Sequence, residues 1–460
     1  MGWANLDTFA AVREQELVRL RSRGLVYLDY TGAAPCPDSV QRAHLEALGR
    51  DVFGNPHSTN PAAMCSTRAA RDARVALLEF LDADPGEYEV VWTSNASAAL
   101  RLVGESFPFD AETPLVLTVD NHNTVNGIRA QAAARGAAVR YLPLDRDLRV
   151  RPFELAPVRN GLFAYPAQSN FSGVQHPLEW VGLAQARGYR VLLDAAAYLP
   201  THPFSLRQIR PDFTALSIYK MCGYPTGVGA LVARHDALRA LVRPGFSGGT
   251  VEYVSVLIDR HQLKNGADGF EDGTGNYLAW NAVPYGLRLL ERLDMRSLEA
   301  HVARLTGRLL RGLTTLCHAN GSSAVRVHGP NVMDRRGGTV AFNLLDDAQT
   351  VVDYERVVDS AAKQGICLRG GCFCNPGCAE RAFDYSADEL ADALDALGDD
   401  FSIPAMRAAL HGKPVGAVRA SLGYGSDPSD VDALLDFLNQ FVIGRGFPDR
   451  RARRSAGQPS

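Results

Sequence analysis

The sequence lacks several features that would assign it to a special class of protein. No apolar run is long enough to cross a bilayer, and the first twenty residues lack the apolar stretch of a signal peptide. The net charge is only −3, so no basic surface for nucleic acid is expected. There is no internal repeat, and the basic cluster Arg445–Arg454 is expected to lie in a disordered tail, residues 445–460. These absences favour an ordinary globular protein of the cytoplasm, bound to neither membrane nor nucleic acid.

Cysteine is sparse except in one place. Four of the eight cysteines, Cys367, Cys372, Cys374 and Cys378, fall within twelve residues. Their spacing, C-x4-C-x-C-x3-C, differs from the C-x2-C knuckle of zinc sites, so no metal is predicted. A structural zinc site, a redox disulfide and a catalytic cysteine are the alternatives for this cluster.

Short apolar runs alternate with helical stretches over the first 280 residues. Runs such as 89–93, 114–120 and 191–197 have the fully apolar character of strands that are buried on both faces. The alternation predicts an α/β fold with a mainly parallel sheet in a large domain, residues 28–280. Residues 1–27 and 281–444 are expected to form a smaller α+β domain. An ordered active-site loop is expected at 246–277, which is rich in glycine and aspartate.

Two polar residues follow predicted strands at positions where α/β proteins bind ligands. Asp194 ends the apolar run VLLD, where a buried carboxylate needs a partner such as a protonated pyridine nitrogen. The alternative for Asp194 is a helix N-cap. Lys220 follows the run FTALSIY, where burial would lower its pKa and favour an imine, although a surface lysine is the alternative. One strand–helix–strand step separates Asp194 from Lys220. This spacing favours the pyridine partner and the imine over the helix N-cap and the surface lysine.

Two further strand ends add to this pattern. Ala96 and Ser97 lie where a strand passes into a helix, so their N–H groups and a hydroxyl could bind a phosphate, with a capping box as the alternative. His122 ends another apolar strand, where its imidazole could stack on a flat ring or simply be hydrogen-bonded. Together the four strand ends offer an anion cradle, an aromatic stacker, a pyridine partner and an imine lysine. This combination is more specific than any single member.

In these motifs the sequence resembles the class V pyridoxal-phosphate (PLP) enzymes, and among them the cysteine-desulfurase-like domain of molybdenum cofactor sulfurases. The resemblance extends in family order over about 400 residues. The segments that carry it are YLDYTGAAPCP (27–37), GNPHS (54–58), TSNASAALRLVGE (93–105), DNHNTVNG (120–127), PAQSNFSG (166–173), LLDAAAYLPT (192–201), SIYKMCGYPTGVGAL (217–231), LRGGCFCNPGC (368–378) and VRASLGY (418–424). The resemblance implies the type I fold of PLP-dependent transferases and a homodimer.

The resemblance also implies roles for individual residues. Lys220 would carry PLP as a Schiff base, His122 would stack on its ring and Asp194 would pair with its pyridine nitrogen. The other implied cofactor contacts are Ala96, Ser97 and Ser217 at the phosphate, Asn170 and Gln168 at the 3′-oxygen or the substrate, and Thr274 at the phosphate of the partner subunit. Arg419 would bind the substrate α-carboxylate with its planar guanidinium. Cys374 would accept the sulfur, and its thiolate is expected to lie exposed near positive groups such as Arg369.

The implied reaction is removal of sulfur from L-cysteine, with a persulfide on Cys374 and alanine as the product. The sequence departs from iron–sulfur-type desulfurases at Tyr219 and Ala197, where those enzymes usually have His and Gln. The C-terminal molybdenum-cofactor-binding domain has no counterpart here, so a stand-alone sulfur donor to an unknown acceptor protein or small molecule is expected. The alternatives are a PLP-dependent C–S lyase, epimerase or aminotransferase that does not use Cys374 covalently, and a non-enzymatic scaffold.

Overall fold

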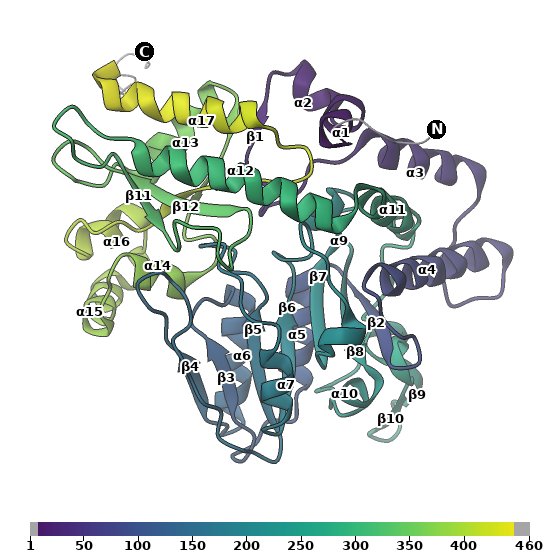
Figure 1. The fold of residues 1–460 in the computed structure, drawn as a ribbon. Coiled ribbons are helices and arrows are strands. Elements are labelled where there is room, and N and C mark those ends of the chain that lie inside the picture. The colour runs from purple at the N-terminus through teal and green to yellow at the C-terminus, as the bar shows by residue number, and fades with distance from the viewer. Residues whose placement is uncertain (1–7, 446–460) are drawn as a thin grey trace, which may run out of the picture.

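The large sheet is a mixed α/β sheet. In the computed structural model, which describes residues 8–445, seven strands pair in the order β2-β8-β7-β6-β5-β3-β4 (Figure 1). The strands are β2 (Tyr88–Thr93), β3 (Leu115–Thr118), β4 (Val139–Leu142), β5 (Gly161–Pro166), β6 (Tyr189–Asp194), β7 (Phe213–Ser217) and β8 (Gly229–Arg234). β8 is antiparallel to both of its neighbours, and the pairs from β7 to β4 are all parallel. The mainly parallel sheet predicted from the sequence is therefore confirmed.

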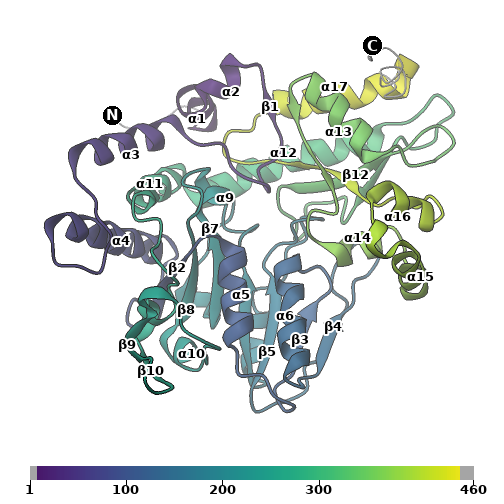
Figure 2. The same ribbon diagram turned by 180° about the vertical axis from the view of Figure 1, so that it is seen from behind.

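Both faces of this sheet are covered, which explains its continuous apolar strands. Every residue of β5 is buried. Leu162 and Ala164 pack in the cluster formed with helices α5 (Ala96–Ser106) and α6 (Asn123–Ala134), which lie in front of the sheet in Figure 2. Phe163 and Tyr165 point into the other cluster, which includes residues of α7 (Trp180–Gln185). Successive side chains of a strand point to opposite faces, so a strand that is covered twice has no polar side.

The N-terminal segment lies against the second, smaller sheet. It forms two helices, α1 (Thr8–Glu16) and α2 (Val18–Ser22), followed by β1 (Val26–Tyr27). β1 pairs in parallel with β13 (Ile366–Cys367) from the far end of the chain. Helices α3 (Asp38–Arg50) and α4 (Pro61–Phe80) then lead into β2.

The smaller sheet is antiparallel and has the order β11-β12-β15-β14. Its strands are β11 (Val325–His328), β12 (Thr339–Leu344), β14 (Arg369–Gly371) and β15 (Ala417–Ser421). The helices of this half are α11 (Val283–Leu293), α12 (Met295–Thr315), α13 (Tyr354–Lys363), α14 (Pro376–Ala382), α15 (Ala387–Leu397), α16 (Ile403–Ala409) and α17 (Pro428–Gln440). The domain limits 28–280 and 281–444 stay a prediction, supported by the separation of the two sheets along the chain.

The segment 246–277 is more regular than the loop expected there. It contains a hairpin of β9 (Val251–Ser255) and β10 (Arg260–Leu263), with exposed apolar residues at its tip. The remaining short helices are α8 (Leu206–Ile209), α9 (Ile218–Cys222) and α10 (His235–Arg239). The 3-10 and π segments are η1 (Gly248–Thr250), η2 (Gly266–Gly269), η3 (Ala279–Ala282), η4 (Gly398–Asp400) and η5 (Phe441–Arg445).

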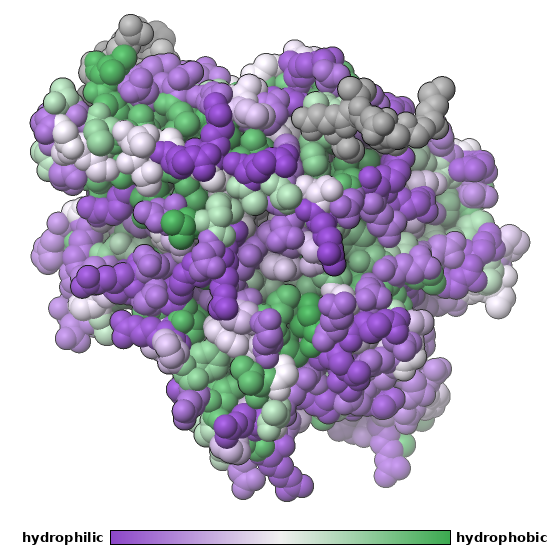
Figure 3. Space-filling view, viewed as in Figure 1, coloured by the Kyte–Doolittle hydropathy of each residue, from purple (hydrophilic) through white to green (hydrophobic). Residues whose placement is uncertain are grey.

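Polar side chains cover most of the face shown in Figure 3, and an apolar area lies over α7, where Leu183 is exposed. Over residues 8–445 we find no helix that combines the length and the apolar character needed to span a membrane. The predicted tail falls, from residue 446 onward, outside the described residues.

Candidate active site

Three of the predicted catalytic and cofactor-binding residues lie at or just beyond the carboxyl ends of strands of the large sheet. Asp194 is the last residue of β6, and His122 follows β3 as the N-cap of α6. Lys220 was expected at the end of a strand, but β7 ends at Ser217 and Lys220 is the middle residue of the short helix α9. The helical turn therefore places Lys220 beyond the end of β7.

The electrostatics of these groups are linked. Burial lowers the pKa of Lys220, and the carboxylate of Asp194 partly opposes this effect. Burial also lowers the pKa of His122, which interacts with both Asp194 and Lys220. Mutual influence of this kind means that the three groups lie within interaction range of one another. Perturbed groups that converge at a strand edge are typical of an active site.

The N-terminus of α5 has the features of an anion cradle. Ser217 at the end of β7 accepts a hydrogen bond from the N–H of Ala96 at 2.8 Å, and Asn95 caps the helix by accepting from Ala98. Ser97 is exposed at the first turn of the eleven-residue helix. The structure thus brings together the predicted phosphate contacts Ala96, Ser97 and Ser217.

Asn170 and Gln168 lie in the loop after β5, but their amide groups are already bonded within the protein. The Asn170 amide donates to the carbonyl of Phe373 at 2.7 Å and accepts from Asn375 at 2.9 Å. Gln168 donates to the carbonyl of Ala197 at 3.0 Å and accepts from Gln175 at 3.1 Å. A direct contact of either amide with a cofactor or substrate therefore stays a prediction.

Arg419 on β15 is buried and oriented by three contacts. It donates to Asp29 at 3.1 Å and to the backbone oxygen of Asn170 at 3.0 Å, and its guanidinium lies 4.7 Å from the ring centre of Phe373. Burial lowers the pKa of Arg419 to about 10, while Asp29 opposes the shift. Its Nε–H has no partner among the described residues, although the atom is buried. An orphaned donor on a buried guanidinium is suited to binding a carboxylate.

Asp29 also binds a second arginine. Arg369 holds its carboxylate through Nε and Nη2, with the shortest distance 2.6 Å. The hydrogen bond with Asp29 is the main cause of the raised pKa of Arg369. The Asp29 carboxylate, which was not among the predicted site residues, therefore fixes one buried and one half-exposed arginine side by side.

Cys374 lies in a tight turn between β14 and α14. The N–H of Asn375 donates to the carbonyl of Cys372 at 3.0 Å, and Phe373 and Cys374 both have positive φ angles, 57° and 55°. This is the pattern of a type I′ turn. The Cys374 side chain is exposed, and its charge influences the pKa values of both Lys220 and Arg419. The exposure agrees with the prediction, and the basic residues in electrostatic range are Lys220 and Arg419. That Arg369 is one of them stays a prediction.

The four clustered cysteines do not converge. Cys372 and Cys374 are exposed, Cys367 is half-buried in β13, and Cys378 is buried in α14 beside Ser169. Burial raises the pKa of Cys378 well above its ordinary value. Among residues 8–445 no group of three or more His, Cys, Asp or Glu side chains has metal-binding geometry.

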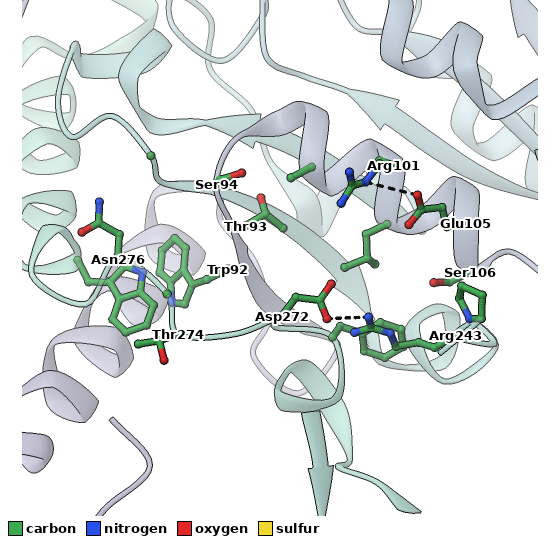
Figure 4. Close-up of a pocket in the computed structure, with 17 residues that line it drawn as sticks. Trp92, Thr93, Ser94, Arg101, Glu105, Ser106, Arg243, Asp272, Thr274 and Asn276 are labelled. Atoms are coloured by element: carbon green, nitrogen blue, oxygen red, sulfur yellow. Dashed lines mark hydrogen bonds and ion pairs between the residues drawn. The ribbon is translucent and has the colours of Figure 1, made fainter. Parts of the chain in front are cut away.

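Thr274 lies apart from the other predicted contacts. It is exposed, accepts a hydrogen bond from Asn55 at 3.3 Å, and lines a cavity of about 400 Å³ beside the β2–α5 connection (Figure 4). Ser94 at that connection and Trp92 line the same cavity. Lys220, Asp194 and Cys374 are not among its lining residues.

The relatives that the sequence resembles are molybdenum cofactor sulfurases. The chain is 33% identical over 476 residues to the molybdenum cofactor sulfurase of Arabidopsis thaliana, covering 93% of this chain and 57% of the plant protein. It is 33% identical over 461 residues to that of Bos taurus, covering 94% of this chain and 51% of the bovine protein. The chain therefore spans little more than half the length of these relatives.

Solved structures of low sequence identity share the fold. A cysteine desulfurase from Thermococcus onnurineus matches with a TM-score of 0.77 at 22% identity, covering 96% of this chain and 100% of that one. The cysteine desulfurase CsdA of Escherichia coli matches with a TM-score of 0.74 at 21% identity, covering 95% and 98%. Residues 26–434 match the family described as aminotransferase class V. With its sheet order and its residues at the strand ends, the chain belongs to the class V aminotransferase family.

Proposed function

We propose that this protein is a PLP-dependent cysteine desulfurase that removes sulfur from L-cysteine, gives alanine and carries the sulfur as a persulfide on Cys374. The observation that carries the proposal is the position of Cys374. Its exposed thiol lies in a turn held beside the carboxylate-binding candidate Arg419 and within electrostatic range of Lys220. A lysine, an anchor for a carboxylate and a nucleophilic sulfur are the groups that the reaction needs.

The residues present fit PLP. Asp194 at the end of β6 matches a protonated pyridine nitrogen, and His122 lies close enough to influence the same site. The first turn of α5, with Ser217, would hold the phosphate, and Lys220 would form the imine. When bound, PLP supplies an electron sink that stabilises negative charge at the substrate Cα.

Arg419 and Lys220 would orient the substrate and move its proton. The guanidinium of Arg419 would bind the α-carboxylate, and Asp29, the Asn170 carbonyl and the Phe373 ring keep it in place. The lowered pKa of Lys220 favours its neutral amine, which can accept the proton from the substrate Cα.

Cys374 would take the sulfur in a step that needs no external oxidant. Its thiolate attacks the sulfur of the substrate, so an S–S bond forms while the substrate Cβ–S bond breaks. The electron pair of the broken bond stays on Cβ and takes up a proton, which gives the methyl group of alanine. The enzyme is left with a persulfide on Cys374, and the exposed position of this residue lets an acceptor reach it.

The test is to incubate the PLP-loaded protein with L-cysteine and to quantify alanine, pyruvate and protein-bound persulfide together. Alanine in step with a persulfide that peptide mass spectrometry maps to Cys374 is the expected result. Pyruvate with free sulfide, and no persulfide on the protein, would replace the proposal by a C–S lyase. A structure described as the cystine C–S lyase C-DES shares the fold, with a TM-score of 0.68 at 19% identity, so the fold suits both reactions.

Replacing Arg419 with lysine is expected to raise KM for L-cysteine more than it lowers kcat. Lysine keeps the charge but loses the planar pair of donors, and one charge-assisted hydrogen bond contributes about 2 kcal/mol, or roughly 30-fold in KM. Steady-state kinetics with L-cysteine would check this. An unchanged KM in a variant that still binds PLP would show that the carboxylate is bound elsewhere.

The proposal includes a homodimer in which Thr274 reaches the phosphate of the partner subunit. It is supported by the exposure of Thr274 and by the hairpin tip, where Val256 and Leu257 are 97% and 92% exposed. Apolar residues this exposed suit contact with a second copy. A molar mass by light scattering that equals a single chain would rule out the homodimer.

A cytoplasmic location and a sulfur acceptor of unknown kind complete the proposal. The eight free thiols support a reducing compartment.

A further inference from the structure

The turn that holds Cys374 has a backbone that ordinary residues avoid. Phe373 and Cys374 are both in the left-handed region, and neither is glycine. Each such residue raises the free energy by about 1 kcal/mol or more, so the conformation persists only where its surroundings impose it. The groups that impose it here are side-chain and backbone contacts to the large domain.

Asn375, the next residue, makes two of these contacts with its side chain. Its side chain is fully buried, with an exposed fraction of 0%. Its amide nitrogen donates to the carbonyl of Asp120 at 2.7 Å and to the side-chain oxygen of Asn170 at 2.9 Å. Its amide oxygen accepts from the N–H of Cys378 at 3.2 Å and so caps α14. Both donor hydrogens and the acceptor of this amide are therefore used.

The two partners of the amide nitrogen belong to loops that carry the chemistry. Asp120 is two residues from His122, and the carbonyl of Cys374 accepts from the N–H of Asn123, the first residue of α6, at 2.8 Å. Asn170 donates to the carbonyl of Phe373 and accepts from Arg419 through its backbone oxygen. Asn375 thus ties the turn to the loops that position the stacking histidine and the substrate arginine.

We propose that Asn375 is a positioning residue, which sets the thiol of Cys374 at the correct distance from the substrate sulfur. This role rests on the proposed persulfide chemistry of Cys374. A displacement of about 1 Å at a reacting atom lowers a rate by roughly 100-fold. Loss of the two donors of Asn375 is therefore expected to slow sulfur transfer without affecting steps that do not involve Cys374.

Two substitutions separate this role from helix capping. Asn375→Asp and Asn375→Ser both keep an oxygen that can cap α14, because aspartate and serine are good N-cap residues. Both remove the pair of N–H donors that reach Asp120 and Asn170. Asn343→Asp is the matched control, because Asn343 is 1% exposed and its amide bonds to the carbonyl of Gly416 at 3.0 Å and to the ring of His328 at 2.6 Å, not to residues 372–375.

The readouts distinguish positioning from a general loss of structure. Alanine and persulfide formed from L-cysteine report sulfur transfer, and exchange of the Cα proton of L-alanine in D₂O, followed by NMR, requires Lys220 but not Cys374. We expect the Asn375 variants to lose about 100-fold in alanine and persulfide formation. Their Cα exchange and the visible absorbance of bound PLP should remain within a few-fold of the wild type, as should all readouts of Asn343→Asp.

Three results would overturn the proposal. The first is full sulfur transfer by both Asn375 variants. The second is a parallel loss of Cα exchange and PLP absorbance in whichever variant folds, because Asn375 would then be structural. The third is the absence of a Cys374 persulfide in the wild type, which would remove the proposed function itself and is recognised without any Asn375 variant.

Discussion

Replacing Lys220 with alanine is expected to lower the rate of alanine formation from L-cysteine by at least about 10³-fold, since a positioned acid–base group contributes 10²–10⁴-fold by itself. The visible absorbance that PLP acquires on a lysine should also disappear. The same nitrogen of Lys220 has both proposed roles, attachment of PLP and transfer of the substrate Cα proton. For this reason no neighbouring side chain can replace Lys220.

The environment of Lys220 explains the size of this effect. Burial lowers its pKa and Asp194 limits the shift, so a neutral amine forms at a lower pH than for a free lysine. Turnover that depends on this amine should rise with pH and level off below the ordinary lysine pKa. Asp194, His122 and the first turn of α5 are unchanged in the variant, so PLP should still bind weakly without a covalent bond.

Lys363→Ala is the matched control, because Lys363 is exposed in the last turn of α13. Absorbance spectra after loading with PLP and gel filtration, together with alanine assays, measure both properties. A Lys220→Ala protein that keeps the visible absorbance and turns over L-cysteine would place the cofactor on another lysine.

The strands of the large sheet could be predicted because burial on both faces leaves a plain apolar signal. Asp194, which ends β6, and His122, which follows β3, were found from the same signal, since ligand sites of parallel sheets lie at carboxyl ends. The short helix α9 left no such signal. Ile218 and Tyr219 suit a strand as well as the residues before them do, so nothing marked the end of β7 at Ser217.

The supporting contacts of the site could not be predicted for a different reason. Asp29 and Arg419 are 390 residues apart, and Asn375 reaches Asp120 across 255 residues. A hydrogen-bonding amide or a buried carboxylate has no periodicity, so only the folded chain shows its partner. The antiparallel direction of β8 was also hidden, because a strand covered on both faces has the same pattern in either direction.

Replacing Cys374 with serine is expected to abolish sulfur transfer, with a loss of at least about 10³-fold in alanine formation, as is usual when a nucleophile is removed. A serine hydroxyl does not ionise near neutral pH and does not form a stable bond to the substrate sulfur. A cysteine thiol can ionise, and its thiolate forms a stable S–S bond. PLP absorbance and Cα exchange of L-alanine should be unchanged, because Cys374 takes no part in either.

Cys372→Ser is the control that isolates Cys374. Both cysteines are exposed and lie two residues apart in the same turn, so they have similar access to reagents. Cys374 alone influences the pKa values of both Lys220 and Arg419, and it should be the residue that carries the persulfide. Peptide mass spectrometry after a single turnover, with alkylation of the persulfide, locates the added sulfur.

The two variants together decide between the reactions that this fold supports. A desulfurase would lose alanine formation with Cys374→Ser and keep it with Cys372→Ser. A C–S lyase breaks the same bond without a protein thiol, so both variants would continue to release pyruvate and sulfide at the wild-type rate. Equal loss in both variants would point to a disulfide or a relay between the two cysteines, because then neither thiol would be sufficient alone.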